Sequence, residues 1–268
     1  MSISSLTTEA TRLIGVFQDK EDEIDAALAA ALVAAADMDV VAYVDSIGPS
    51  SDSNAGTALA PFATLNKALS LAQTGVSLTV YLANDGNYSW SNIIHASNCV
   101  IRLYDWVPTY RSVGVQPKPI ITQGAIYSTN ETGDQCAMLY GVNSHVHMRS
   151  CVFKTAVHTL AGRPWLNWWE GIVSSPGSMV RLALISTDLE LNDAAPASAQ
   201  GGVQLVLKTS SVTRTVLTTP LIRLDNAFCM ASIVSVTFDP TIALADMIEG
   251  VERSVLQVPV NFLSNVVI

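Results

Sequence analysis

Charged side chains are scarce in this sequence, and basic ones are the scarcest. Only 14% of the 268 residues are charged, against roughly 25% in an ordinary globular domain. Asp and Glu number 23 and Lys and Arg 14, for a net charge of −9. A protein that binds nucleic acid through its phosphates needs a basic surface, so we expect no nucleic-acid partner. Hydrophobic residues make up 49% of the chain, which argues against disorder.

A long apolar segment is also missing. The longest charge-free stretch of apolar character, Ala26 to Ala36, is shorter than the ~20 residues that a membrane-spanning helix needs. Met1 to Ala10 lacks the basic start and the continuous apolar core of a secretory signal peptide. We therefore expect a protein that is made in the cytoplasm and does not insert into a membrane.

Motifs for metal, cofactor or nucleophilic chemistry are absent as well. The four cysteines include no CxxC pair, and we expect free thiols. No Gly-x-Ser-x-Gly elbow and no glycine-rich phosphate loop occurs, so no cofactor is expected. His145 and His147 would share one face of a strand, where three chains could present them to a metal on a threefold axis. Ordinary histidines at the edge of a core are the simpler interpretation, and we predict no metal site.

Carboxylates are present but scattered along the chain. A glycoside hydrolase needs two of them about 5–10 Å apart, one with a raised pKa. Asp188 and Glu190 are the best local pair, because alternation along a strand puts both on one face. Two solvated carboxylates at the rim of a fold are the simpler interpretation. We predict no catalytic residues, although an enzyme is not excluded.

The first 40 residues form a segment distinct in charge and pattern. Eight acids against Arg12 and Lys20 give this segment a net charge of −6. Proline is absent between Thr7 and Asp39, which favours a long helix. Apolar residues recur every seven positions, as in a coiled coil, and a widened stripe fits three helices better than two. The predicted trimerisation residues are Leu13, Phe17, Ile24, Ala31 and Met38. The alternative is an amphipathic helix packed on its own domain.

The rest of the chain reads as β-structure with one short helical exception. Residues 41–45 resemble a strand, and a helix is expected from Phe62 to Ala72, with Pro61 in its first turn. Beyond Val76, short runs of Val, Ile, Leu and Thr recur about every 20–30 residues without hairpin loops. This pattern predicts an all-β fold, a parallel β-solenoid of about six to nine coils over 76–268, with the helix of 41–75 capping its first coil.

Three of the five tryptophans fall in the short segment 163–171. If Pro164 begins a helical turn, these tryptophans share one face. Such a face could stack on sugar rings, with neighbouring polar groups bonding to hydroxyls, or it could be buried within the fold or between protomers. We favour burial and keep the ligand platform open. The candidate ligand-binding residues are Arg163, Trp165, Trp168, Trp169 and Glu170.

The segments Tyr43–Ser46, Asp52–Thr57 and Pro61–Leu69 together resemble a known family. They are similar to the entry segment of right-handed parallel β-helix proteins of the pectate-lyase-like type, in particular bacteriophage tail fibres and tailspikes. Leu13–Ala27 is similar to the helical stems of such fibres. The resembling parts cover about a quarter of the chain.

This resemblance implies a homotrimeric, structural component of a virion. Residues 1–40 would form a coiled-coil stem that attaches to a phage tail or baseplate protein, and 76–268 would contact the host surface, with a surface glycan as the receptor. The alternative is a tailspike endoglycosidase or lyase that acts on host polysaccharide. The entry segment specifies a fold and leaves the choice between these two activities open.

Overall fold

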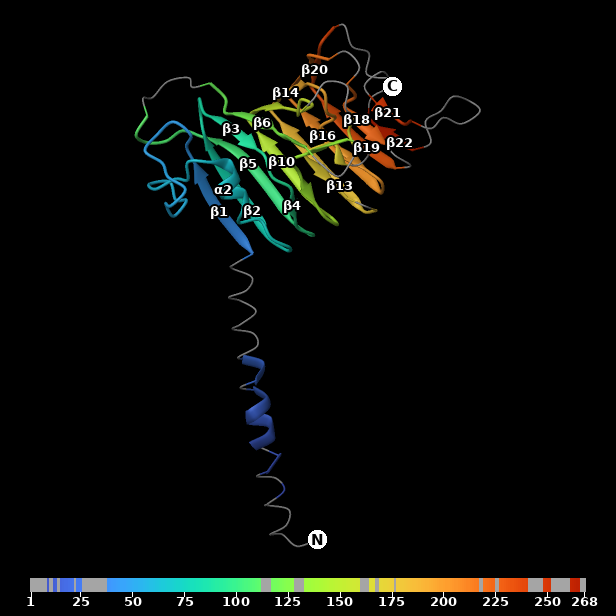
Figure 1. The fold of residues 1–268 in the computed structure, drawn as a ribbon. Helices are drawn as coiled ribbons and strands as arrows, with labels where there is room; N and C mark the ends of the chain where they lie inside the picture. The colour runs from blue at the N-terminus through green and yellow to red at the C-terminus, as the bar shows by residue number, and fades with distance from the viewer. Residues whose placement is uncertain are drawn as a thin grey trace. The chain divides into compact units, whose positions relative to one another are not determined.

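The chain divides into two compact units in a computed structural model, Met1–Asp39 and Val40–Ile268 (Figure 1). The structure describes residues 9, 12–13, 15–21, 23–25, 38–111, 117–127, 133–159, 164–166, 169–175, 177–216, 219–224, 227–240, 248–251 and 261–265. No helix among these residues is long and apolar enough to cross a membrane.

The N-terminal unit is helical at every described position between residues 9 and 25. Arg12 pairs with Glu9 at 2.5 Å and Lys20 pairs with Glu23, and both pairs have the three-residue spacing of neighbours on a helix surface. Both pairs are largely exposed to solvent, where such contacts add little stability.

Apolar side chains of this unit are exposed in the single chain. Phe17 and Ile24, which are seven residues apart, are 71% and 64% exposed. Leu13 and Met38 are also exposed, whereas Ala31 lies outside the described residues. The described apolar residues of the predicted seam are therefore not buried within the helical unit itself.

The larger unit is mostly β-structure built from parallel sheets, which confirms the all-β expectation. The first sheet has the order β1 (Asp39–Val44), β2 (Ser77–Ala83), β5 (Val100–Trp106), β10 (His145–Arg149), β13 (Met179–Ile185), β16 (Gly202–Lys208), β19 (Phe228–Val234) and β22 (Phe262–Ser264). The second has the order β20 (Thr237–Phe238), β17 (Ser211–Arg214), β14 (Asp188–Leu191), β11 (Val152–Lys154), β6 (Ile120–Gln123) and β3 (Asn87–Trp90).

The remaining described strands form three smaller sheets. The first is β12 (Val173–Ser174), β9 (Leu139–Tyr140) and β4 (Ile94–His95), and the second is β15 (Ser198–Ala199), β18 (Ile222–Leu224) and β21 (Ile248–Glu249). The antiparallel pair β7 (Ala125–Tyr127) and β8 (Asp134–Cys136) makes the third. From β2 onward, neighbours within the parallel sheets are not consecutive along the chain, because the chain adds strands to other sheets before it returns to the same one.

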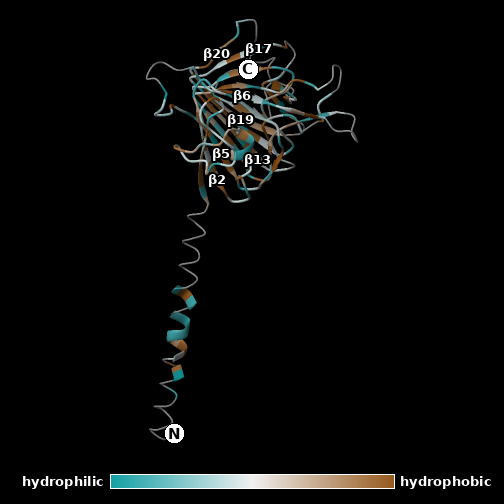
Figure 2. Ribbon diagram, turned by 60° about the vertical axis from the view of Figure 1, so that its left-hand side comes forward, coloured by the Kyte–Doolittle hydropathy of each residue, from teal (hydrophilic) through white to brown (hydrophobic). Residues whose placement is uncertain are grey.

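Rows of apolar side chains fill the core, because the same parallel register is repeated from strand to strand. In the eight-stranded sheet one row runs from Leu78 through Ile101, Val146 and Leu182 to Leu205, and every member is fully buried. Side chains alternate in burial along each strand, so the other face of this sheet is partly open to solvent. Hydrophobic segments accordingly gather along the strands (Figure 2).

The chain passes between the two large sheets through five short corners of two or three residues. One residue in each corner has a φ between 50° and 67°: Asp85, Ser150, Ser186, Thr209 and Ser235. A left-handed backbone costs an L-residue roughly 1–2 kcal/mol. The left-handed position is therefore occupied by a polar residue and not by glycine at each of these corners.

At two of these corners the next residue is buried and donates a hydrogen bond to a carbonyl of the neighbouring strand. Thr187 donates its hydroxyl to the carbonyl oxygens of Met148 (3.2 Å) and Ile185 (3.1 Å). Ser210 donates in the same way to Leu184 and Lys208. Small polar side chains thus satisfy carbonyl groups that would otherwise be buried without partners.

Helix α2 (Leu65–Leu69) is shorter than the expected helix and begins later, so the expectation of a start at Pro61 and Phe62 is wrong. The backbone of Phe62 is already committed to an extended bridge, because its N–H donates to Tyr43 and its carbonyl accepts from Asp45. Asp52 accepts from the backbone N–H groups of Ala63 and Thr64, as expected of a turn carboxylate.

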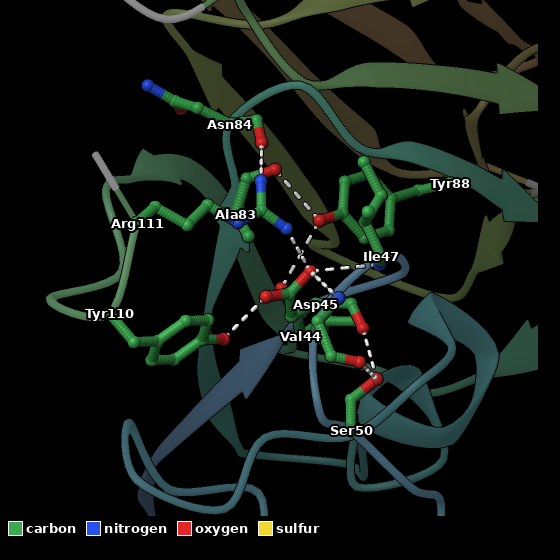
Figure 3. Close-up of polar contacts among 10 residues, drawn as sticks. Val44, Asp45, Ile47, Ser50, Ala83, Asn84, Tyr88, Tyr110 and Arg111 are labelled. Carbon is green, nitrogen blue, oxygen red and sulfur yellow. Dashed lines mark hydrogen bonds and ion pairs between the residues drawn. The ribbon is translucent and has the colours of Figure 1, made fainter. Parts of the chain in front are cut away.

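A buried ion pair fastens the first strand to the segment that follows β5 (Figure 3). Asp45 is fully buried, pairs with Arg111 and accepts from Tyr110 Oη at 2.5 Å and from the N–H groups of Ile47 and Gly48 at 2.9 Å. Burial raises the pKa of this carboxyl, but the hydrogen bonds and the arginine outweigh burial and hold the pKa below its usual value.

Candidate functional site

A cleft of about 310 Å³ lies beside Trp165, one of the predicted ligand residues. This volume is at the small end of the range typical of ligand pockets, roughly 300–1,000 Å³. The cleft is lined by His158, Pro164, Trp165, Asp193, Val216, Thr219, Pro220 and Arg223. An aromatic wall with imidazole, carboxylate and guanidinium groups around it can both stack on a ring and bond to hydroxyls.

Trp165 is held as part of the wall and is 7% exposed. Its indole Nε1 donates to the carbonyl of Asp193 at 2.8 Å, and the ring of His158 stacks on it with centroids 4.2 Å apart. Its backbone forms an isolated parallel bridge with Asp134. The expected helical turn at Pro164 is therefore wrong at this position, because the chain on both sides of Trp165 is bonded to Asp134 as a strand would be.

Two carboxylates, those of Asp134 and Asp193, lie close to His158. Asp134 is fully buried and accepts from the N–H of Thr159 at 2.8 Å and from its hydroxyl at 2.9 Å. Its Oδ2 lies 3.5 Å from Nδ1 of His158. Asp193 Oδ2 accepts from the backbone N–H of His158 at 2.9 Å. Asp193 thus holds the backbone of His158, and the imidazole lies beside Asp134 and stacks on Trp165 at the cleft wall.

Glu170 lies behind the cleft wall, and its side chain is fully buried. Oε1 accepts from the N–H of Ala195 at 2.6 Å, and Oε2 lies 2.6 Å from the guanidinium of Arg223. Burial raises the pKa of this carboxyl to about 7, because the charge of Arg223 offsets only part of the lost hydration. Arg223 also binds Glu249 at 2.9 Å and is the side chain that connects Glu170 with the cleft.

Of the other predicted ligand residues, Trp169 stacks on a different ring from the one that stacks on Trp165. Trp169 is half-buried and stacks on Tyr140, with centroids 4.8 Å apart and an interplanar angle of 11°. His95 meets the same tyrosine edge to face at 5.5 Å. Arg163 and Trp168 lie outside the described residues.

The remaining candidates are engaged elsewhere in the β unit. Asp188 pairs with Lys118 and Glu190 pairs with Lys154, both at 2.8 Å. Burial raises the pKa of Asp188, but hydrogen bonds from Lys118 and Ser211 outweigh it and lower the pKa below its usual value. A catalytic acid needs the opposite shift. No group of three or more metal-ligating side chains occurs among the described residues.

Three of the residues that define the cleft had no local signal in the sequence. His158, Asp193 and Arg223 are 35 and 30 positions apart, and only the folding of the β unit brings them together. No protein-family model, no curated protein and no solved structure matches this chain. The cleft belongs to a class of binding site that combines aromatic and polar side chains, here on a scaffold of parallel β-sheets.

Proposed function

We propose that this chain is the subunit of a trimeric phage tail fibre. Residues 1–40 join three copies in a coiled-coil stem and attach the fibre to the tail or baseplate. Residues 76–268 wind into a right-handed parallel β-helix that contacts a glycan of the host surface. The protein is then a binding and assembly component of the virion.

The observation that carries this proposal is the exposure of Phe17 and Ile24 on a helical unit distinct from the β unit. Burying one large apolar side chain contributes roughly 1.5–3 kcal/mol. Two such residues seven positions apart favour a helical partner in the same register, and identical copies supply one. The repeated parallel register of the β unit supports the β-helix, because each return of the chain adds one strand to the same sheets.

The cleft supports binding more than hydrolysis. Glu170 has a pKa in the range of a catalytic acid, but it has no solvent exposure and both of its oxygens are engaged. An acid must reach the leaving-group oxygen to protonate it. Incubation with host polysaccharide should therefore release no new reducing ends, and release would favour the tailspike glycosidase or lyase instead.

The assembly is tested on the full chain by sedimentation equilibrium. The expected mass is three times the 28.5 kDa of one chain. Phe17→Ser with Ile24→Ser should give monomers whose β unit keeps its far-ultraviolet circular dichroism, because the two units have separate cores. Gln18→Ser with Asp25→Ser, one position along from each, is the matched control and should stay trimeric. A monomeric wild-type chain would refute the stem.

The virion assignment needs a separate measurement. Antibodies against the purified chain should label one end of the tail on phage particles from the producing host in electron micrographs. Labelling that is absent from intact particles while the chain is abundant in the same lysate would remove the proposed role in the virion.

A further inference from the structure

A basic depression lies on the outer face of the eight-stranded sheet, away from the residues that form the cleft. It has a volume of about 190 Å³ and is lined by Val100, Arg102, His145, Val146, His147, Arg181, Ala183 and Ile185. Two of the fourteen Lys and Arg residues and two of the four histidines gather here, in a chain with a net charge of −9. None of the described residues that line this hollow is a carboxylate.

The register of three neighbouring strands creates the hollow. On β10, His145 lies between Val100 of β5 and Arg181 of β13. Two residues on, His147 lies between Arg102 of β5 and Ala183 of β13. Long basic side chains therefore alternate with short apolar ones across β10. The short ones leave space between two guanidinium groups that stand on strands about 10 Å apart, twice the usual strand spacing.

In two other sheets of the β unit, a basic side chain lies opposite an acidic one. Lys154 lies opposite Glu190 and forms an ion pair at 2.8 Å, and Arg223 lies opposite Glu249 at 2.9 Å. In the basic depression each arginine lies opposite a histidine instead. A bound anion would supply the negative charge that Glu190 and Glu249 supply in those two pairs.

The side chains of the depression have unused bonding capacity. Arg102 donates to Ser77 Oγ. Arg181 is exposed, and its guanidinium has no hydrogen-bond or carboxylate partner within the described part of the chain. The Nε2 atom of His147 is buried without a partner, while its Nδ1 lies 3.4 Å from Tyr104 Oη. Guanidinium groups bind carboxylate and other oxyanions through paired N–H donors.

A row of aromatic rings leads away from this depression on the same face. Tyr104 meets His147 edge to face at 5.4 Å and Tyr81 at 6.0 Å. Tyr81 stacks on Tyr43 with centroids 5.0 Å apart. These rings are half-buried and lie on β1, β2 and β5 beside the basic groups. Aromatic rings beside oxyanion donors suit a sugar that has an acidic substituent.

We propose that Arg102, His145, His147 and Arg181 form a binding site for the carboxylate of an acidic saccharide. The proposal names a receptor chemistry and rests in that respect on the fibre function above. The guanidinium groups bind the carboxylate, and His147 Nε2 donates to it when protonated. A sugar ring of the same saccharide lies along Tyr104.

The site should bind more tightly in mild acid. Burial and the nearby arginines lower the pKa of His145 and His147, so both imidazoles are largely neutral at pH 7.5 in the free protein. The other charged or titratable groups that face them are Tyr104 of β5 and Arg149 of β10, while β2 contributes Ser77 and Thr79 to the adjoining rows. A bound carboxylate favours the protonated imidazoles, and binding and protonation therefore reinforce each other.

The test is isothermal titration of the full chain with tetragalacturonate at pH 5.5 and 7.5 in low salt. The neutral counterpart is maltotetraose, and sodium sulfate tests a free anion. Tetragalacturonate should bind, and more tightly at pH 5.5, whereas maltotetraose should not bind at this site. Arg102→Gln and Arg181→Gln should each weaken binding on the order of tenfold or more, as expected for a lost charge-assisted bond. Lys208→Gln, on the same face of β16, is the matched control and should leave the affinity unchanged.

Each contrary outcome has a distinct meaning. Equal binding by the arginine variants would overturn the site, and so would failure of tetragalacturonate to bind the wild type. Arginine-dependent binding of sulfate alone would overturn the saccharide and leave only a small-anion site. A trimeric chain that labels virions but ignores tetragalacturonate would lose this proposal and keep the fibre function. A monomeric chain that binds tetragalacturonate would lose the fibre function and keep the saccharide site.

Discussion

The buried carboxyl of Glu170 should make the β unit less stable as the pH rises from 4.5 to 7. Its pKa is about 7 in the folded chain and 4.5 ordinarily, so within this interval the folded state holds a proton that the unfolded chain has released. Stability falls with rising pH wherever the folded state binds more protons. The stabilisation by protonated Glu170 is therefore complete below pH 4.5 and is lost as the pH passes 7.

The magnitude follows from the size of the pKa difference. Each pKa unit corresponds to about 1.4 kcal/mol, so the rise from 4.5 to about 7 is equivalent to about 3 kcal/mol. Glu170→Gln keeps an oxygen that can accept from the N–H of Ala195 at 2.6 Å but cannot ionise. Relative to wild type, the unfolding free energy of this variant should rise by about 3 kcal/mol between pH 4.5 and 8. The altered contact with Arg223 adds a difference that does not change with pH.

The assay is urea unfolding of the full chain, followed by tryptophan fluorescence at fixed protein concentration across this pH range. Subtracting the two free-energy profiles cancels every other titrating group. Glu249→Gln is the control, because Glu249 binds the same guanidinium from an exposed position. Its charge makes the smallest contribution to the raised pKa of Glu170, so its removal should reduce the wild-type slope only slightly. A difference between Glu170→Gln and wild type that stays constant with pH would refute the argument that burial holds a proton on Glu170.

Two further perturbations test how the β unit is held together. Asp45→Asn should cost about 3–5 kcal/mol in unfolding free energy, because it leaves Arg111 buried without its charge partner. Since the pKa of Asp45 is lowered in the folded chain, the wild type should lose stability as the pH falls below 3.8, and the variant should lose less. Acid unfolding followed by circular dichroism measures this difference. Gly141→Ala should destabilise the fold strongly, because the new Cβ would lie 2.1 Å from the Ala96 carbonyl oxygen. Gly75→Ala is the comparison: its Cβ meets no atom within 4 Å, so it should cost only the roughly 1–2 kcal/mol of its left-handed φ. Equal melting temperatures of the two variants would contradict the packing argument.

The all-β character could be predicted from the sequence because it depends on local texture. Short runs such as Leu78–Leu82 alternate between buried and half-exposed positions in the structure, as the pattern requires. The start of α2 could not be predicted in the same way. Phe62 has the apolar spacing of a helix face, but hydrogen bonds to Tyr43 and Asp45, almost twenty residues earlier, draw its backbone into an extended bridge.

The tryptophan segment shows the same competition between local and distant partners. Trp165 and Trp169 have the spacing of one helical face, yet Trp165 is bridged to Asp134 and Trp169 stacks on Tyr140. Each of these contacts spans about thirty residues of sequence. Local helix propensity contributes tenths of a kcal/mol per residue, whereas a buried aromatic with a satisfied N–H contributes several times more.

Sites in such a fold depend on register more than on motif. Arg102 and Arg181 are 79 positions apart, and each becomes part of the basic depression only because β5 and β13 both pair with β10 in a fixed alignment. Since successive side chains on a strand face opposite ways, moving either strand by one position would bury its arginine and expose an isoleucine or a leucine in its place. The apolar rows beneath the depression, Ile101 with Val146 and Leu182, hold this alignment against such a slip. The core residues therefore determine where the charges of the outer face meet, and a search of the sequence for local charge clusters cannot find this site.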